Sequence, residues 1–279
     1  MNAARRQDPP ASPGPAAEHF ARRHVWETKY AIRACYRGWL DRLGPFIAPG
    51  TSLEVGAGSG HVKAFWPGLI ESDVVATPFV DLVADGMRLP FAAGSLSNIL
   101  VIDLLHHLRD PHAFFDEAAR VLRSGGRVLA IEPYITPASF VGYKLLHHED
   151  VYFGGYHRAA DTADPWAGNL ALPNLLFGRR RREWRRRHPE LRIIHRRKFS
   201  LLDFQLAGGF KPYAFVARPR VYEWIAALDR RLDWLAPLMG FRILCVIERC
   251  RSPAPASRDA AAGAPDVTRA GRGPGSGPG

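Results

Sequence analysis

The sequence predicts an α/β fold: a doubly wound, mostly parallel sheet with helices on both faces. Residues 98–103 (Asn-Ile-Leu-Val-Ile-Asp) are almost wholly apolar, which is typical of central parallel strands because both of their faces are covered. Residues 51–55 form another short apolar strand, which runs directly into a glycine-rich loop. Strand and helix patterns alternate from residue 51 to residue 132, as expected when helical crossovers join parallel strands.

The remaining elements follow from hydrophobic periodicity and from local stop signals. One helix is clearly bounded by Asp110 as N-cap, Pro111 at its first position and Gly125-Gly126 beyond its end. The other expected elements are one or two helices in 17–43, a short helix at 61–65, strands at 69–75, 80–84 and 127–132, an arginine-rich helix at about 174–187, a strand at 191–199, a helix at 219–236 and a closing strand at 241–247.

Two of these elements carry specific expectations. The helix at 219–236 is expected to face the core with one apolar side, made of Val221, Trp224, Ile225, Leu228, Leu232 and Leu235. The interval between the strands at 69–75 and 80–84 is shorter than the dozen or so residues that a parallel crossover normally needs. Either a tight loop makes that connection or the first of the two strands is misplaced.

The domain organisation follows from composition. Residues 1–16 and 252–279 are rich in Pro, Gly, Ala and Ser and poor in large apolar side chains, so they are predicted to be disordered tails. Residues 17–251 are expected to form one domain with a motif core at 50–135. Irregular segments at about 133–173 and 200–218 follow late strands and are expected to form a cap insertion at the carboxyl edge of the sheet, where ligands bind.

Cysteine content and the distribution of charge limit which cellular compartment and which binding partners the sequence predicts. The three cysteines, Cys35, Cys245 and Cys250, form no C-x-x-C pair, so neither a disulfide framework nor a zinc site is predicted. No apolar run approaches the ~20 residues of a transmembrane segment, and we expect a cytoplasmic protein. The formal net charge is +11, and Arg179–Lys198 alone holds eleven basic against two acidic residues, a net of +9.

The glycine-rich loop is the most informative segment of the chain. It reads Leu-Glu-Val-Gly-Ala-Gly-Ser-Gly over residues 53–60, a G-x-G-x-G pattern with an acid two residues before it. Glycines at a strand end permit a tight turn and let a ligand approach the backbone closely. The pattern is not the G-x-G-x-x-G dinucleotide fingerprint, because its third glycine would fall at His61.

Four segments together resemble those of a known family. The loop at 53–60 resembles motif I of class I S-adenosylmethionine-dependent methyltransferases. Residues 85–91 (Asp-Gly-Met-Arg-Leu-Pro-Phe), 99–108 and 122–129 resemble later motifs, with Ser124 in place of the family's proline. The set is most similar to the type-11 (ubiquinone-biosynthesis-like) methyltransferases over about residues 50–135, and more loosely to residue 250. The resemblance implies S-adenosylmethionine as cofactor and leaves the acceptor open.

The resemblance also implies a set of cofactor-binding residues: Glu54, Gly56, Ala57, Gly58, Gly60, Asp73, Asp85, Gly86, Met87 and Asp103. Glu54 would hold the methionine ammonium end through water, and Asp73, with Glu71 as the alternative, would bind the ribose hydroxyls. Asp85 would accept from the adenine amine, and Asp103 would lie by the reacting methyl group. The alternative for Asp85 and Asp103 is a helix cap or a turn cap.

Methyl transfer from a sulfonium is an in-line displacement, so alignment and exclusion of water supply much of the catalysis. His106 and His107 are the candidate catalytic residues if a base is needed; alternatively, one packs under the sheet and the other caps a turn. Other titratable candidates are Glu132, Tyr134, His147, His148, Glu149 and His157. The run 147–150 (His-His-Glu-Asp) is not expected to bind a metal, because adjacent side chains do not converge, and no metal site is predicted.

Two absences narrow the acceptor. The turn at 103–106 lacks the Asn/Asp-Pro-Pro-aromatic motif of amino-methylating DNA enzymes, and no cysteine between Cys35 and Cys245 could serve cytosine C5 methylation. The predicted function is therefore methyl transfer to a small-molecule or lipid-like acceptor. The alternatives are an RNA or tRNA methyltransferase that uses Arg179–Lys198, and a non-catalytic binding protein that retains the fold, although the glycine loop and its acid are intact.

The arginine-rich helix carries a further prediction. Phe177, Trp184 and His188 can share one face that packs against the sheet, which leaves most arginines outward. Seven arginines within the nine residues 179–187 repel one another. We therefore predict that this face meets an anionic surface, either acidic phospholipid at the inner membrane face or a phosphate-bearing carrier, in preference to nucleic acid.

Overall fold

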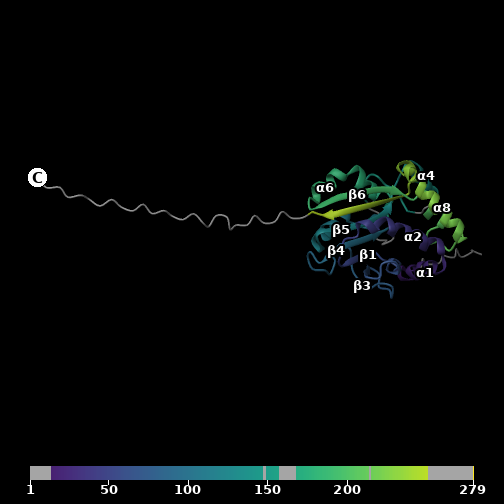
Figure 1. Ribbon diagram of the computed structural model, residues 1–279, viewed down its shortest axis with the longest axis horizontal. Coiled ribbons are helices and arrows are strands. Elements are labelled where there is room, and N and C mark those ends of the chain that lie inside the picture. Colours follow the sequence, from purple (N-terminus) through teal and green to yellow (C-terminus); the bar gives the residue numbers. More distant parts are fainter. Residues whose placement is uncertain (1–13, 147–148, 157–167, 214, 251–278) are drawn as a thin grey trace, which may run out of the picture.

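The centre of the protein is a seven-stranded sheet, seen in a computed structural model that describes residues 14–146, 149–156, 168–213, 215–250 and 279 (Figure 1). The strands are β1 (Ser52–Val55), β2 (Leu69–Asp73), β3 (Leu82–Val83), β4 (Leu96–Ile102), β5 (Leu122–Pro133), β6 (Leu191–Phe199) and β7 (Arg242–Arg249). Their order is β3-β2-β1-β4-β5-β7-β6, and only β7 runs antiparallel to its neighbours. The predicted doubly wound, mostly parallel sheet is confirmed, and its order reverses between β1 and β4, where such sheets bind ligands.

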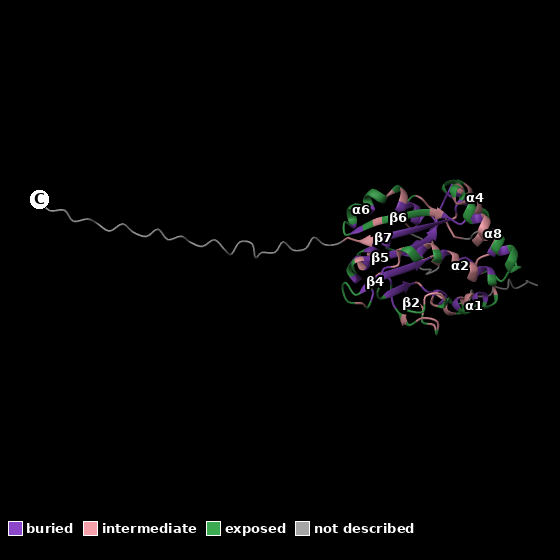
Figure 2. Ribbon diagram, viewed as in Figure 1, coloured by how far each residue is buried: buried purple, intermediate pink, exposed green. Residues whose placement is uncertain are grey.

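Alternate residues of β4 face two different core layers. Ile99 and Val101 pack with α3 (Pro111–Val121) and with the chain at 172–187, whereas Leu100 and Ile102 pack with helices on the opposite face. The helices that supply this second layer are α1 (Pro15–Thr28), α2 (Tyr30–Leu43), α7 (Asp203–Ala207) and α8 (Pro219–Arg231). Figure 2 shows the result, with buried strands between helices whose outer faces are exposed.

Short elements complete the chain. They are η1 (Gly44–Phe46), η2 (Val62–Ala64), η3 (Leu105–His107), α4 (Pro137–Leu146), η6 (Asp233–Leu235) and α9 (Ala236–Met239). Asp110 caps α3 as predicted, because its Oδ1 accepts from the backbone N–H groups of His112 and Ala113 at 2.9 and 3.1 Å. The described part of the chain contains no helix that is long and apolar enough to span a bilayer.

A tight loop connects β2 to β3, so of the two alternatives for this crossover the loop is right. Residues 74–81 contain no helix, and β3 pairs in parallel with β2 through Ser72–Leu82 and Asp73–Val83. Asp81 attaches the end of this loop to β2: its carboxylate accepts from the Glu71 N–H at 2.8 Å, and its own N–H donates to the Glu71 carbonyl at 2.8 Å.

The arginine-rich segment is not one continuous helix. It consists of α5 (Leu172–Asn174), a π-helical turn η5 (Leu175–Arg179) and α6 (Arg181–Arg187). Its predicted inner face is confirmed, since Phe177, Trp184 and His188 are buried and all three rings lie against Phe115. The break comes from the π turn, in which Arg180 N–H donates to the Leu175 carbonyl five residues before it.

The predicted core face of the helix at 219–236 is only partly right: Ile225 is buried and Leu228, Leu232 and Leu235 are half-buried, but two members of the predicted face are exposed. Val221 and Trp224 are 45% and 67% exposed, and the buried positions of α8 are Tyr222, Ile225 and Asp229. Asp229 fixes this orientation because its Oδ1 accepts from the N–H groups of Leu201 and Leu202 at 2.9 and 2.7 Å. A buried acid that caps a neighbouring loop thus outweighs the burial of one tryptophan.

The predicted segment boundaries also differ at the ends. Helix α1 begins at Pro15, inside the segment that we expected to be a tail, while residues 1–13 and 251–278 lie outside the described residues. The insertion expected to be irregular contains the helix α4, and residues 147–148 and 157–167 within it also lie outside the described part.

Candidate active site

Two adjoining cavities open at the carboxyl ends of β1, β2 and β4. The first, which we call the glycine-loop cavity, has a volume of about 160 Å³ and is lined by residues 56–59, 73–75 and 102–104, together with side chains of α1. The second, the aromatic cavity, has a volume of about 350 Å³ and is lined mainly by residues from 133–149 and 204–242. Arg22, Asp103, His107 and Phe210 line both cavities, so the two spaces meet at the end of β4.

The glycine loop needs its glycines. Gly56, Gly58 and Gly60 have φ angles of +76°, +59° and +66°, which side chains rarely allow. A Cβ on Gly56 would lie 2.7 Å from Leu104 Cδ1, and one on Gly60 would overlap the backbone oxygen of Phe79. The loop therefore presents bare backbone to the cavity, a surface on which a flat ligand can lie.

Glu54 is fully buried behind this loop. Its Oε2 has no hydrogen-bond partner among the described residues, and the residue does not line either cavity. Burial, and then the charges of Glu71 and Asp73, raise the pKa of the Glu54 carboxyl well above its ordinary value. A carboxylate placed in this way gains most from an incoming cation, so it fits the predicted contact with an ammonium group through water.

Of the two acids considered for the ribose, Asp73 lies at the glycine-loop cavity. Its two oxygens accept from the N–H groups of Gly58 and Val75 at 2.8 and 2.9 Å, so it also ties β2 to the glycine loop. Glu71 instead accepts from the Lys63 N–H at 3.0 Å and is not part of the cavity lining. The geometry therefore favours Asp73 as the cofactor-facing acid.

The segment predicted to hold adenine lies outside both cavity linings. Asp85 is exposed, and its Oδ1 accepts from the Met87 N–H at 2.9 Å, which makes it a turn cap in this geometry. Gly86 is buried, and a Cβ there would lie 2.8 Å from Val55 Cγ1. A contact of Asp85, Gly86 or Met87 with an adenine ring remains a prediction.

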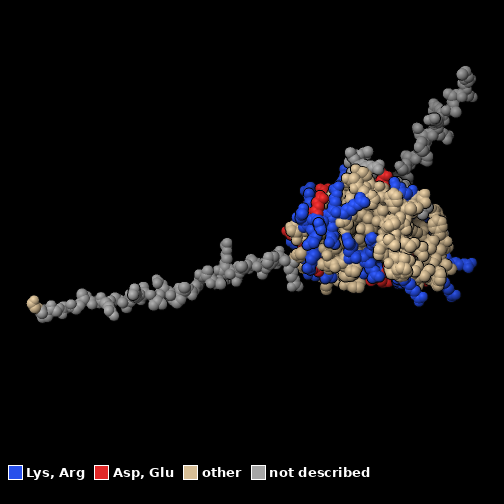
Figure 3. All heavy atoms as spheres, turned by 90° about the horizontal axis from the view of Figure 1, so that it is seen from above, with Lys and Arg blue, Asp and Glu red and all other residues tan. Residues whose placement is uncertain are grey.

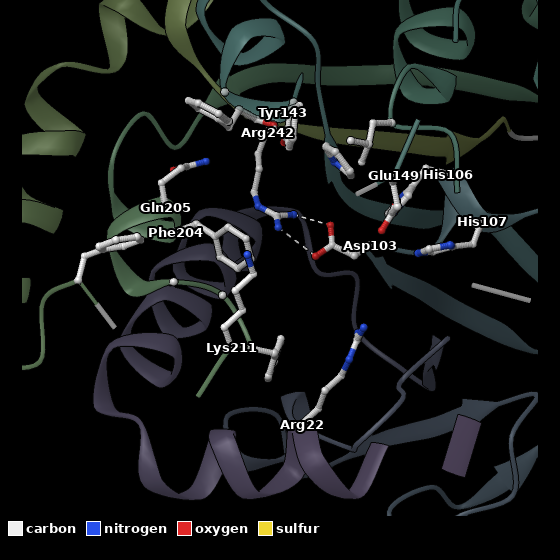
Figure 4. Close-up of a pocket in the computed structure, with 18 of the residues that line it drawn as sticks. Arg22, Asp103, His106, His107, Tyr143, Glu149, Phe204, Gln205, Lys211 and Arg242 are labelled. Carbon is white, nitrogen blue, oxygen red and sulfur yellow. Dashed lines mark hydrogen bonds and ion pairs between the residues drawn. The ribbon is translucent and has the colours of Figure 1, made fainter. Parts of the chain in front are cut away.

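Asp103 is held at the junction of the cavities by a buried arginine. It adopts a left-handed φ of +54°, and its oxygens lie 2.5 and 3.0 Å from the guanidinium nitrogens of Arg242 (Figure 4). That guanidinium lies between the rings of Trp39 and Phe204, 4.2 Å from each centroid. Burial acts to raise the pKa of Asp103, but the charge of Arg242, its hydrogen bonds to Asp103 and the charge of His106 together outweigh burial and lower the pKa.

His106 lies between two carboxylates. Its Nδ1 is 2.8 Å from Glu132 Oε2, and its Nε2 is 3.4 Å from Glu149 Oε2. The second oxygen of Glu132 accepts from the N–H groups of Leu104 and Leu105 at 2.9 and 2.7 Å, which fixes the turn after β4. Burial acts to lower the pKa of His106, but the hydrogen bonds to both glutamates outweigh it and raise the pKa to about 10.

His107 also lines both cavities, with its ring 4.1 Å from that of His106. Burial, together with the neighbouring His106, lowers the pKa of His107 to about 3. Both predicted catalytic histidines thus face the aromatic cavity, together with Glu149. Tyr134 is buried in the core and is not part of the lining, and the other histidine candidates, His147, His148 and His157, lie outside the described residues.

The rest of the aromatic cavity comes from segments far apart in the sequence. Its apolar lining includes Tyr143, Phe204, Phe210, Tyr213, Phe215 and Phe241. Lys29 holds one of these segments against the N-terminal helices, because its Nζ donates to the carbonyls of Gly209, Lys211 and Tyr213 at 2.8 to 3.0 Å. Sequence reasoning missed Arg242 and Lys29, since neither lies in a motif and both act on residues more than 100 positions away.

Comparison with known proteins identifies a methyltransferase domain within the chain. The family model described as a methyltransferase domain (type 11) matches residues 53–130, and a search of curated protein sequences finds no match. A chain in the complex between the Haloferax volcanii Trm112 methyltransferase activator and the putative methyltransferase aligns with a TM-score of 0.51 at 15% identity, covering 85% of this chain and 96% of that chain. A SAM-dependent methyltransferase from Archaeoglobus fulgidus aligns with a TM-score of 0.50 at 14% identity, covering 78% of this chain and 94% of that chain. At these identities the structural likeness shows the fold. Residues 53–130 thus form a methyltransferase domain, and the fold around it is one that solved SAM-dependent methyltransferases share.

Proposed function

We propose that the protein transfers the methyl group of S-adenosylmethionine to a small-molecule or lipid-like acceptor that binds in the aromatic cavity. The observation that carries this proposal is the junction of the two cavities at Asp103 and His107. A cofactor on the glycine loop and an acceptor in the aromatic cavity would meet there, and a direct displacement requires that meeting.

The lining of the glycine-loop cavity, and Glu54 buried behind the loop, support cofactor binding there. The bare backbone of Gly56–Ser59 would carry its methionine part, the buried Glu54 carboxylate would attract its ammonium group, and Asp73 would face its ribose hydroxyls. When bound, the cofactor supplies an activated methyl group on a sulfonium. The chain's own contribution is to orient that group towards the aromatic cavity and to exclude water, with Asp103 held in place by Arg242.

The lining of the aromatic cavity supports an acceptor with an apolar body. Aromatic rings from α4, α7 and the chain around residues 208–215 surround the space. The lining also contains six charged side chains, and two of them, Lys211 and Arg22, lie towards one side (Figure 4). His106 and His107 remain the candidates for contact with the reacting atom of the acceptor.

A transfer assay tests the proposal. Full-length protein incubated with methyl-labelled cofactor and fractionated cell extract is expected to place label in the lipid or small-metabolite pool. Gly58→Arg should abolish the transfer, because its side chain would enter the cavity from a φ of +59° and a Cβ there already lies 3.3 Å from the His19 ring. Gly94→Arg is the matched control, since Gly94 has a φ of +68° but has open space around its Cβ position.

The pool that receives the label discriminates among the functions. Label in RNA would favour the RNA methyltransferase alternative over the proposal. If the wild type transfers no label and binds no cofactor in calorimetry, the chain is a binding protein that has kept only the fold.

The basic segment supports a location for this activity. Within Arg179–Lys198 every basic side chain except Arg180 and Lys198 is exposed, and the basic residues gather on one face of the molecule (Figure 3). Asp116, Glu248 and Asp233 compensate Arg187, Arg192 and Arg197 in part. The other four arginines of α6, namely Arg181, Arg182, Arg185 and Arg186, have no carboxylate of the described residues within ion-pair distance.

An exposed apolar patch accompanies these arginines. It consists of Phe140, Val141 and Leu145 on α4, Trp234 on η6, and Leu238 and Met239 on α9. Helices α4 and α9 pack together, and Lys198 of the basic segment donates to the Pro237 carbonyl at 3.0 Å, so the patch adjoins the basic segment. Apolar and aromatic side chains beside cationic ones are typical of a surface that rests in a lipid interface. We therefore favour an anionic bilayer as the docking partner. Helix α4 belongs both to this patch and to the lining of the aromatic cavity, so docking would bring the cavity close to the bilayer.

Vesicle co-sedimentation tests the docking surface. The wild type should sediment with vesicles that contain acidic phospholipid and not with neutral vesicles, because each basic residue near such a surface contributes about 1 kcal/mol. Changing Arg179, Arg182 and Arg186 to Glu should abolish sedimentation. Changing the exposed Arg88, Arg109 and Arg220 to Glu, with the same total charge, should not. Equal sedimentation of all three proteins would contradict membrane docking, as would salt-sensitive binding to RNA alone.

A further inference from the structure

Three side chains from separate segments converge at the wall of the aromatic cavity. His106 and His107 belong to η3 after β4, and Glu149 follows α4. One nitrogen or oxygen atom of each lies within 4.8 Å of the corresponding atoms of the other two. The His106 Nε2 to Glu149 Oε2 distance is 3.4 Å, which is the separation of two ligands about 2.1 Å from a tetrahedral Zn²⁺.

Glu132 orients His106 as a metal-binding histidine is usually oriented. It accepts from Nδ1 of the ring at 2.8 Å, which leaves Nε2 directed towards Glu149. Metal-ligating histidines almost always donate their other ring N–H to a carboxylate or carbonyl, which fixes the ring and its tautomer. Glu132 is itself fixed by the backbone N–H groups of Leu104 and Leu105.

The backbone at Gly168 makes room for this convergence. A Cβ on that residue would lie 2.5 Å from Glu149 Oε2 and 3.1 Å from both His106 Cδ2 and His107 Cε1. A side chain at position 168 would therefore displace the Glu149 carboxylate and would require both imidazole rings to give way by a few tenths of an ångström. The absence of a side chain is thus a condition for their close approach.

The local charge favours a divalent cation. Glu132 and Glu149 each lie within ion-pair distance of His106, and Asp103, which pairs with Arg242, lies beside them. Two carboxylates remain on either side of His106. A second set of possible ligands, Asp103, His106 and Glu132, is a poorer choice because Arg242 already occupies Asp103 and Glu132 already occupies the His106 Nδ1.

We propose that His106 Nε2, His107 and Glu149 form a binding site for a divalent transition-metal ion, with Zn²⁺ as the ion that suits these ligands. Two imidazoles and one carboxylate are a ligand set of catalytic zinc sites, which keep one position open. Since all three side chains line the aromatic cavity, the open position faces the acceptor. There the ion would take an oxygen atom of the acceptor as a ligand. This role of the ion rests on the proposed function, but the binding of the ion to the protein does not depend on that function.

This site departs from the expectation that the chain binds no metal. The run 147–150 was set aside because adjacent side chains do not converge on one ion. The proposed site uses only one member of that run, Glu149, and takes its other ligands from a turn 42 and 43 positions earlier. These two ligands, His106 and His107, are adjacent in sequence, but the turn η3 brings their rings to 4.1 Å from each other, so the expectation that adjacent side chains do not converge fails at this turn. Such a combination of distant residues leaves no spacing pattern that a sequence motif can capture.

Metal titration of the full-length protein, without an affinity tag and after treatment with a chelator, tests the site. We expect one equivalent of Zn²⁺ to bind in calorimetry. Glu132→Gln should weaken binding about 10- to 100-fold, and His107→Ala and Glu149→Gln should weaken it further. His24→Ala, which removes an exposed imidazole on α1, is the matched control and should bind as the wild type does. Gly168→Ala should also weaken binding, although it removes no ligand.

Two further measurements separate a loss of metal binding from a failure to fold, and neither of them requires methyl transfer. Circular dichroism of each variant before metal addition shows whether it is folded. The visible spectrum of the Co²⁺-loaded wild type should show the strong bands of a four- or five-coordinate site. A weak octahedral spectrum, no stoichiometric binding, or equal affinity in wild type and folded Glu149→Gln would overturn the proposal. Failure to transfer label in the extract assay would not, because no cofactor or acceptor is present in the titration.

Discussion

Replacing Arg242 with methionine is expected to lower the free energy of unfolding by about 3 kcal/mol. The guanidinium is buried between Trp39 and Phe204 and forms two hydrogen bonds to Asp103, whose side chain keeps 31% exposure. Methionine can fill the space between the rings but leaves Asp103 without its counter-charge and with a left-handed backbone to maintain. The partial exposure of Asp103 places the expected loss at the lower end of the range for broken buried pairs.

Urea unfolding measures this loss, with Arg192→Met as the matched control. Arg192 lies on the neighbouring strand β6 and pairs with Glu248 of β7 at 3.2 Å, but the Arg192 side chain is 67% exposed. Removing that surface pair should change the stability by no more than about 0.5 kcal/mol. In the double variant Asp103→Asn/Arg242→Met the loss should be smaller than the sum of the single losses, because no uncompensated charge remains. A loss in Arg242→Met as small as that in Arg192→Met would show that the pair does not hold the site.

Glu54→Gln is expected to weaken binding of S-adenosylmethionine about 10- to 100-fold while it stabilises the free protein. A hydrogen bond to a charged group contributes about 1.5 to 3 kcal/mol, and glutamine cannot offer a charge to the ammonium end of the cofactor. In the free protein the same carboxylate is a liability, because it is buried with one oxygen unpartnered among the described residues. Function and stability are thus expected to change in opposite directions at this position.

The pH dependence of the stabilisation has a definite sign. Because the folded-state pKa of Glu54 is raised, the folded chain binds more protons than the unfolded chain from the ordinary value of 4.5 upward. The stability of the free wild type therefore falls as the pH rises through the window that begins at 4.5, and this loss is absent in Glu54→Gln. The variant should exceed the wild type in stability at about pH 8 by roughly 1 kcal/mol or more and match it at low pH.

Urea unfolding across that pH range and cofactor calorimetry together check the prediction for Glu54. Glu190→Gln, at an exposed side chain, is the control and should leave both measurements unchanged. A variant that is less stable than the wild type at every pH would mean that Glu54 is already paired in the free protein. Unchanged affinity would remove Glu54 from the cofactor site.

Local chemistry made much of the fold predictable. The apolar run of β4, the N-cap at Asp110 and the glycine loop after β1 each act through residues that are neighbours in the chain, so their patterns survive in the sequence. The same holds for the inner face of α6, where Trp184 is the single apolar residue among arginines. The buried face of helix α8 was predictable only in part, because its orientation depends on residues outside the helix. Asp229 accepts from the N–H groups of Leu201 and Leu202, which belong to a different segment of the chain.

By itself, the sequence determined the fold class, the presence of a methyltransferase domain and the loop on which the cofactor is expected to lie, because steric freedom at glycine and the periodicity of burial are local properties. Only the tertiary structure decided that Asp73 rather than Glu71 reaches the cavity, that Arg242 holds Asp103, and that Glu149 joins His106 and His107. Each of these depends on a contact between strands or loops that are distant in sequence. Electrostatic and hydrogen-bond energies depend on the distance between groups in space, and the separation of two residues along the chain does not determine that distance.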